Sequence, residues 1–150
     1  MRQHSDAMAQ HLGRLKILCG AILAGVVVFA AVVWFLLGSG TFTPPEAIPS
    51  YLATLLNLAG LLLIVTAHFL PRFFRRPPKE APEEAHLARH GQVTIITFAL
   101  REGGALVALV GALVTGEMLG GLAVASLAVF TMLLAWPRAE QVFPAPWDSP

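Results

Sequence analysis

Two adjacent ionisable residues, Arg101 and Glu102, stand within a long run of apolar residues. Charged side chains are costly in lipid, and within a membrane-spanning segment they often mark an ion or proton pathway. Glu102 is therefore a candidate proton- or ion-binding group, and the neighbouring guanidinium of Arg101 would modulate its charge state. Helix packing through interhelical hydrogen bonds is the alternative role for both side chains.

Four other polar residues in apolar segments could pair with these two. Thr131 and Ser126 are expected at about the depth of Glu102, His68 lies nearer the end of its segment, and Asn57 lies near mid-bilayer. Each could hydrogen-bond across helices, a role that polar side chains commonly play in membranes.

Other catalytic chemistry has little support in the sequence. Cys19 is the single cysteine, so the chain cannot form an internal disulfide or a dithiol centre. His86 and His90 are four residues apart on an expected helix, but no clear third ligand accompanies them. We therefore expect no metal site, no cofactor and no enzymatic activity.

The composition indicates the elements that must position these residues. Among 150 residues, 56% are hydrophobic and only 13% are charged, and the mean hydropathy is +0.70. Soluble domains carry about 25% charged residues. Four apolar runs, each near the ~20 residues that cross a bilayer as a helix, account for the difference. They cover residues 17–37, 49–70, 94–114 and 118–136, and their only charged side chains are Arg101 and Glu102.

The segments between these runs are too short to fold as separate domains. We expect one all-α membrane domain over residues 1–150, with a loop at 71–93 and a flexible tail at 137–150. Only residues 115–117 separate the third and fourth runs, so these should form an antiparallel hairpin. The first and second runs should form another.

Lys and Arg near the ends of spans are retained on the cytoplasmic side. Nine of the ten basic residues lie before the first span, in the loop at 71–93 or in the tail, and Arg101 is the tenth. Both termini and the 71–93 loop should therefore be cytoplasmic, in a bacterial-type inner membrane. The chain offers no large basic face, so a nucleic-acid partner is not expected.

The third span carries a face of small and polar residues at spacings of three and four. At about 100° per residue they align with Arg101, whereas Glu102 projects about 100° away. Small residues allow close backbone approach, so this face should be a helix–helix contact. Its members are Thr94, Thr97, Gly104, Ala108 and Gly111.

Residues 94–114 also resemble the carboxylate-bearing helix of the c subunits of F-type rotary ATP synthases. The resemblance rests on the run Ala99-Leu100-Arg101-Glu102 followed by small and apolar residues. In that family such a carboxylate binds a proton or sodium ion at subunit contacts, which implies an ion-binding carboxyl for Glu102 alone. The four expected spans differ from the two of that family.

These observations favour a small multi-pass membrane protein that acts as an accessory, assembly or scaffold subunit of a membrane complex. Its partners would be the lipid bilayer and other membrane subunits, or further copies of the chain. The alternative is an oligomeric proton- or ion-translocating protein that uses Glu102.

Overall fold

All the secondary-structure elements in the described part of the chain are helices. A computed structural model describes residues 2–45, 48–49, 51–74 and 82–138. The described part contains four α-helices, one short 3-10 helix and no strand, which confirms the all-α expectation there. The elements are α1 (Arg2–Gly38), α2 (Tyr51–Phe69), η1 (Leu70–Arg72), α3 (Glu83–Thr115) and α4 (Met118–Leu134).

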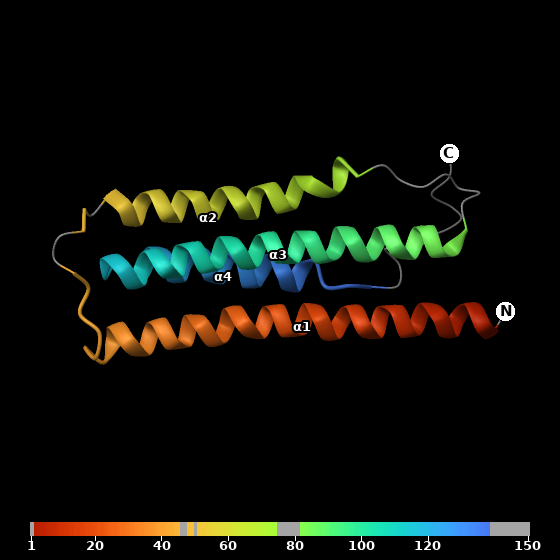
Figure 1. Cartoon of the computed structure of the whole chain (residues 1–150), viewed down its shortest axis with the longest axis horizontal. Coiled ribbons are helices and arrows are strands. Elements are labelled where there is room, and N and C mark those ends of the chain that lie inside the picture. Colours follow the sequence, from red (N-terminus) through yellow and green to blue (C-terminus); the bar gives the residue numbers. More distant parts are fainter. Residues whose placement is uncertain (1, 46–47, 50, 75–81, 139–150) are drawn as a thin grey trace.

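The four α-helices lie side by side as a bundle, with α1 and α2 on opposite sides of α3 (Figure 1). Helix α3 packs against each of the other three, and α4 also contacts α1 and α2. Helix α3 makes the most extensive contacts with the other helices, so its side chains can reach each of them.

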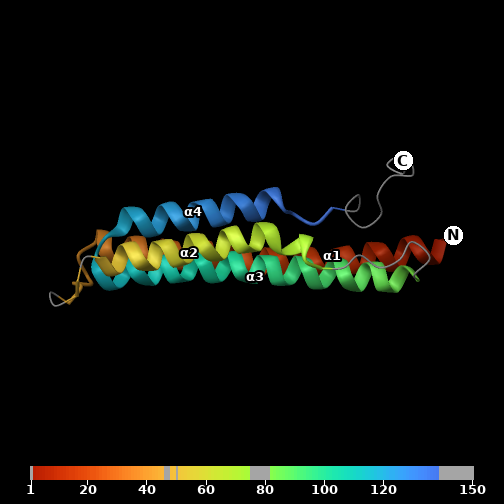
Figure 2. The same ribbon diagram turned by 90° about the horizontal axis from the view of Figure 1, so that it is seen from above.

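Helices α1 and α3 extend well beyond their predicted spans. Helix α1 begins at Arg2 and α3 at Glu83, whereas the apolar runs begin at residues 17 and 94. At 1.5 Å per residue, their 37 and 33 residues measure about 56 and 50 Å, against about 30 Å of hydrocarbon. Figure 2 shows both running past the ends of α2 and α4. The polar residues before the apolar runs continue the helices, because polarity alone does not end a helix.

Within the described residues, three helical segments are long and apolar enough to cross a membrane, as expected of an integral membrane protein. They are Ala9–Gly38, Tyr51–Arg72 and Glu84–Thr115. Helix α4 is apolar but has 17 residues, which is about 26 Å, and it ends two residues before the predicted boundary at 136. A turn at Ala135 ends it ahead of Pro137.

Glycines allow the closest contacts of α3. A β-carbon added at Gly104 would lie 2.6 Å from the Gly60 carbonyl oxygen in α2, so the two backbones touch there. On the α4 side, a β-carbon at Gly121 would lie 2.7 Å from the Ala108 carbonyl oxygen. In lipid, such contacts replace the hydrophobic effect as the main source of helix association.

The link between α3 and α4 also depends on a glycine. Gly116 has a φ of 78°, in the left-handed region, and its N–H donates to the Ala112 carbonyl at 2.8 Å. A non-glycine residue is disfavoured at this φ, and the left-handed residue ends α3. Helix α4 then begins at Met118, two residues later.

Candidate functional site

Arg101 is buried at the centre of the bundle without a hydrogen-bond partner for two of its nitrogens. The residue is 6% exposed, and its Nε and Nη1 atoms are buried and unsatisfied within the described part of the chain. Its guanidinium carbon lies 6.0 Å from the centre of the Phe98 ring, one turn earlier in α3. Long helical side chains point toward the helix N-terminus, which explains this placement.

The guanidinium borders a cavity of about 230 Å³ formed by α2, α3 and α4. The polar side chains in its wall are those of Arg101, His68 and Thr131. The remaining lining is apolar and consists of Ile64, Val65, Phe69 and Leu127. None of these lining residues is acidic, so the cavity holds a cation and supplies no carboxylate for it.

Glu102 leaves α3 on another side, toward α1. Its Oε1 atom lies 3.6 Å from the position that a β-carbon at Gly25 would take. The side chain is partly buried between these two helices. The adjacent Arg101 and Glu102 therefore serve different helix contacts, because one residue of separation turns a side chain by about 100°.

The structure separates the four predicted polar partners. His68 and Thr131 border the same cavity as Arg101, whereas Ser126 lies in a groove between α1 and α4. The Thr131 hydroxyl donates to its own helix at the Ala128 carbonyl, at 2.9 Å, and its oxygen keeps the capacity to accept. Thus only two of the four residues are placed with Arg101.

Asn57 is predicted to hydrogen-bond across helices, and its carbonyl oxygen makes no such bond among the described residues. Its Oδ1 atom is buried and has no hydrogen-bond partner among the described residues. Its Nδ2 atom occupies the space that a β-carbon at Gly120 of α4 would need. Steric fit against a glycine thus positions this amide.

The predicted small-residue face of α3 lies in the interior of the bundle. Thr94 and Thr97 are buried, and the Thr97 hydroxyl donates to the Thr94 carbonyl at 2.9 Å. Ala108 is fully buried, and a β-carbon at Gly111 would lie 2.9 Å from the β-carbon of Leu56 in α2. Close packing therefore dominates this face.

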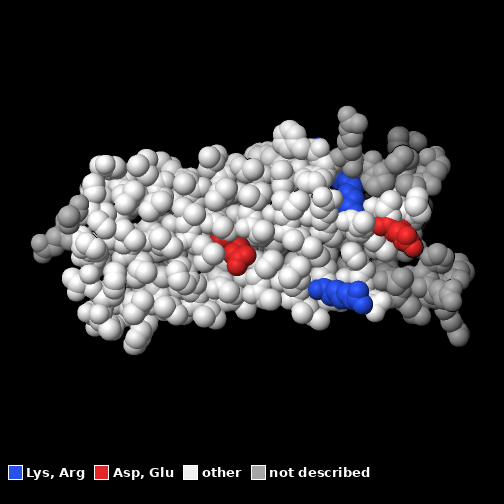
Figure 3. Space-filling view, in the orientation of Figure 1, with Lys and Arg blue, Asp and Glu red and all other residues white. Residues whose placement is uncertain are grey.

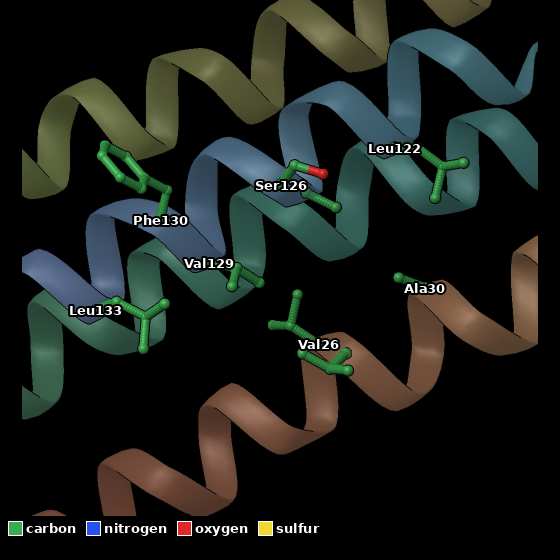
Figure 4. Close-up of a pocket in the computed structure, with 9 residues that line it drawn as sticks. Val26, Ala30, Leu122, Ser126, Val129, Phe130 and Leu133 are labelled. Atoms are coloured by element: carbon green, nitrogen blue, oxygen red, sulfur yellow. The ribbon is translucent and has the colours of Figure 1, made fainter.

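A second, larger cavity is an apolar groove between α1 and α4, with a volume of about 390 Å³. Figure 4 shows Val26 and Ala30 of α1 facing Val129 and Leu122 across it, with Ser126 as its polar member. The full lining is Val26, Val27, Ala30, Leu122, Ala125, Ser126, Val129, Phe130 and Leu133. The two helices therefore do not close against each other along this stretch.

Charges on the surface are distributed unevenly. On the face in Figure 3, coloured atoms gather toward the end where α1 begins, apart from an acidic patch near the middle. At that end, Arg89 donates to the Phe74 carbonyl at 2.9 Å, and the Arg72 guanidinium stacks 5.0 Å from the Phe69 ring centre. Two arginines thus contact the stretch at the end of α2 and just after it, next to the residues that α2 contributes to the Arg101 cavity. The basic residues Arg75, Arg76 and Lys79 and the tail from residue 139 lie outside the described residues.

The sequence does not predict that His11 of α1 lies near His90 of α3. Both residues are in the parts of these helices that extend past the predicted spans. A β-carbon at Gly91 would lie 3.1 Å from Cε1 of His11, and the Nε2 atoms of His11 and His90 are buried and unsatisfied. Burial lowers the pKa of His90, and the charges of His11 and Arg89 lower it further. The described residues include no cluster of three metal-ligating side chains, so these histidines form no such site there. No pattern in the sequence indicates that two residues so far apart in the chain lie close together in the fold.

Comparisons with protein-family models, with curated proteins and with solved structures give no match to this chain.

Proposed function

We propose that the chain is a non-enzymatic accessory, assembly or scaffold subunit of a membrane complex. Its single domain crosses the membrane four times as two antiparallel hairpins, with both termini in the cytoplasm. The membrane is of the bacterial inner-membrane type, as the distribution of basic residues favours.

The α1–α4 groove carries this proposal. Its walls are almost wholly apolar, and it lies between two helices that the sequence predicts to be membrane-spanning. Val27, Phe130 and Leu133 present exposed apolar surface along it. Side chains of a further transmembrane helix would fill such a groove, and van der Waals packing is a principal source of helix association in lipid. The partner is another membrane subunit or a second copy of this chain.

The groove predicts a variant that blocks association. Ser126→Trp places a large ring in the groove from the α4 side, so it should reduce recovery of the partner about tenfold or more, which corresponds to roughly 1.4 kcal/mol. The measurement is quantitative mass spectrometry of proteins recovered with the tagged chain from mild detergent, with the apparent oligomer size measured alongside.

Ala123→Trp is the matched control, because Ala123 is exposed on α4 and does not line the groove. This control should recover the partner at the wild-type level. A wild-type chain that purifies as a partner-free monomer would contradict the proposal. Equal recovery by wild type and Ser126→Trp would exclude the groove as the contact.

The contact of Glu102 with α1 favours a second candidate, an oligomeric proton- or ion-translocating protein. A carboxyl group lies against Gly25 in the interior of the predicted membrane segment, where an ionisable group is costly unless it has a task. The resemblance to the c-subunit helix points the same way. Arg101 would then act on Glu102 only through its charge, since the two side chains face different helices.

A further inference from the structure

We propose that the Arg101 cavity is a binding site for an anionic phospholipid, whose phosphate pairs with Arg101 and whose acyl chain lies against the apolar lining that α2 and α4 contribute to the cavity. The site is separate from the α1–α4 groove, and the inference does not depend on the proposed subunit role.

Arg101 has no counter-ion among the residues that the structure describes. Burying a charge is unfavourable unless it is paired and hydrogen-bonded, and Arg101 is more than nine-tenths buried with two unsatisfied nitrogens. The ring of Phe98 beneath the guanidinium supplies only a weak attraction at 6.0 Å. An anion in the cavity would accept from the free N–H groups and neutralise the charge.

The lining of the Arg101 cavity combines polar and apolar side chains. Arg101, His68 and Thr131 offer donors and acceptors, and Arg pairs with phosphate oxygens in a bidentate manner. Ile64, Val65 and Leu127 offer hydrocarbon, and Leu127 and Val65 are themselves exposed on the outer surface of the bundle. An amphiphile fits this division better than an inorganic anion.

The cavity lies close to the ends of α2 and α4. His68 and Phe69 are the last two residues of α2, and Thr131 lies three residues before the end of α4. The side chain of Arg101 points toward the N-terminal end of α3, which is the end where α2 and α4 finish. The Arg72 guanidinium lies 5.0 Å from the centre of the Phe69 ring, so a second cation stands beside a residue of the cavity wall. A phosphate near the membrane surface can reach Arg101 there, with its acyl chain directed inward.

The test measures lipid affinity by native mass spectrometry of the full chain in a non-ionic detergent. The probes are dioctanoylphosphatidylglycerol, dioctanoylphosphatidylcholine and inorganic phosphate. Wild type should bind one phosphatidylglycerol at least about tenfold more tightly than phosphatidylcholine. Arg101→Gln should remove that preference, because a charge-assisted hydrogen bond is worth about tenfold or more in affinity.

Two further variants separate the cavity from general charge effects. Lys16→Gln removes one exposed cation from α1, away from the cavity, and should stay within about twofold of wild type. Leu127→Trp fills the apolar part of the cavity while Arg101 is retained, and should weaken phosphatidylglycerol binding by a factor similar to Arg101→Gln. Size-exclusion profiles verify folding, and if Arg101→Gln does not fold, Leu127→Trp decides the result.

Phosphatidylglycerol affinity that is unchanged in the folded variants Arg101→Gln and Leu127→Trp would overturn the proposal. Equal binding of the two lipids by wild type would do so as well. Competition by inorganic phosphate at the potency of phosphatidylglycerol would reduce the site to one for a free anion. If Arg101→Gln instead releases a co-purifying membrane protein and leaves lipid binding intact, the cation serves a protein carboxylate.

Discussion

At the scale of single residues, the sequence directs attention to Arg101 and Glu102 but does not predict what each one faces. Their depth follows from the apolar runs, because the thickness of hydrocarbon fixes how many residues a span contains. The structure then separates them, with Arg101 beside His68 and Glu102 beside Gly25. The 100° turn between adjacent residues separates them, but the order of the helices around α3 decides which helix each one faces, and the periodicity of one helix cannot supply that order.

The ion-translocating alternative makes a prediction at this scale. Glu102→Gln keeps the shape of the side chain but cannot ionise. It should therefore lower proton flux into proteoliposomes at least about tenfold, because a positioned proton-transfer side chain typically contributes at least that much to the rate. Flux is measured with an entrapped pH-sensitive dye under an imposed gradient.

Glu117→Gln is the matched control, because Glu117 is exposed at the turn before α4. It should leave the flux at the wild-type level. Flux that is the same in wild type, Glu102→Gln and empty vesicles would eliminate ion translocation through this carboxyl.

At the scale of elements, the small-residue face of α3 explains how α2, α3 and α4 pack around a cavity that contains a cation. Gly104 permits backbone contact with Gly60, while Arg101, one turn earlier on the same face, is too large for such contact and lies at a cavity. The spacing of Gly104, Ala108 and Gly111 indicates such a contact face from sequence alone. The full length of α1 does not follow from hydropathy, because its first 15 residues precede the apolar run, whereas His86 and His90 are already expected on a helix ahead of the third run.

A pair of adjacent glycines tests this packing. Gly104→Ala places a methyl group against the Gly60 carbonyl, which is backbone and cannot turn aside, so the variant should lose about 1–3 kcal/mol of unfolding free energy. Gly103→Ala meets nothing within 4 Å and should be neutral or more stable by up to about 1 kcal/mol, since alanine favours helix over glycine. Unfolding in mixed micelles with increasing dodecyl sulfate measures both. Equal stability of the two variants would show that α2 and α3 do not touch at Gly104.

At the scale of the whole molecule, both proposed sites require α4 to cross the bilayer beside its neighbours. In the part of the chain that the structure describes, three helical segments meet the length and hydropathy of a membrane span, while α4 has 17 residues. A short apolar helix can still span if the bilayer thins locally or flanking residues reach the interface, at a modest cost. Ala135 and Trp136 extend its apolar surface as far as Pro137. Four crossings would return residue 138 to the side where α1 begins.

Labelling of single cysteines from outside intact cells tests these four crossings most directly. Cys19 is the only cysteine and is fully buried, so a Cys19→Ala background leaves no native thiol. Thr41→Cys lies between α1 and α2, and Arg138→Cys follows α4; both positions are exposed. A membrane-impermeant maleimide should label Thr41→Cys in intact cells and Arg138→Cys only in inside-out vesicles. Labelling of Arg138→Cys in intact cells would contradict four crossings with cytoplasmic termini.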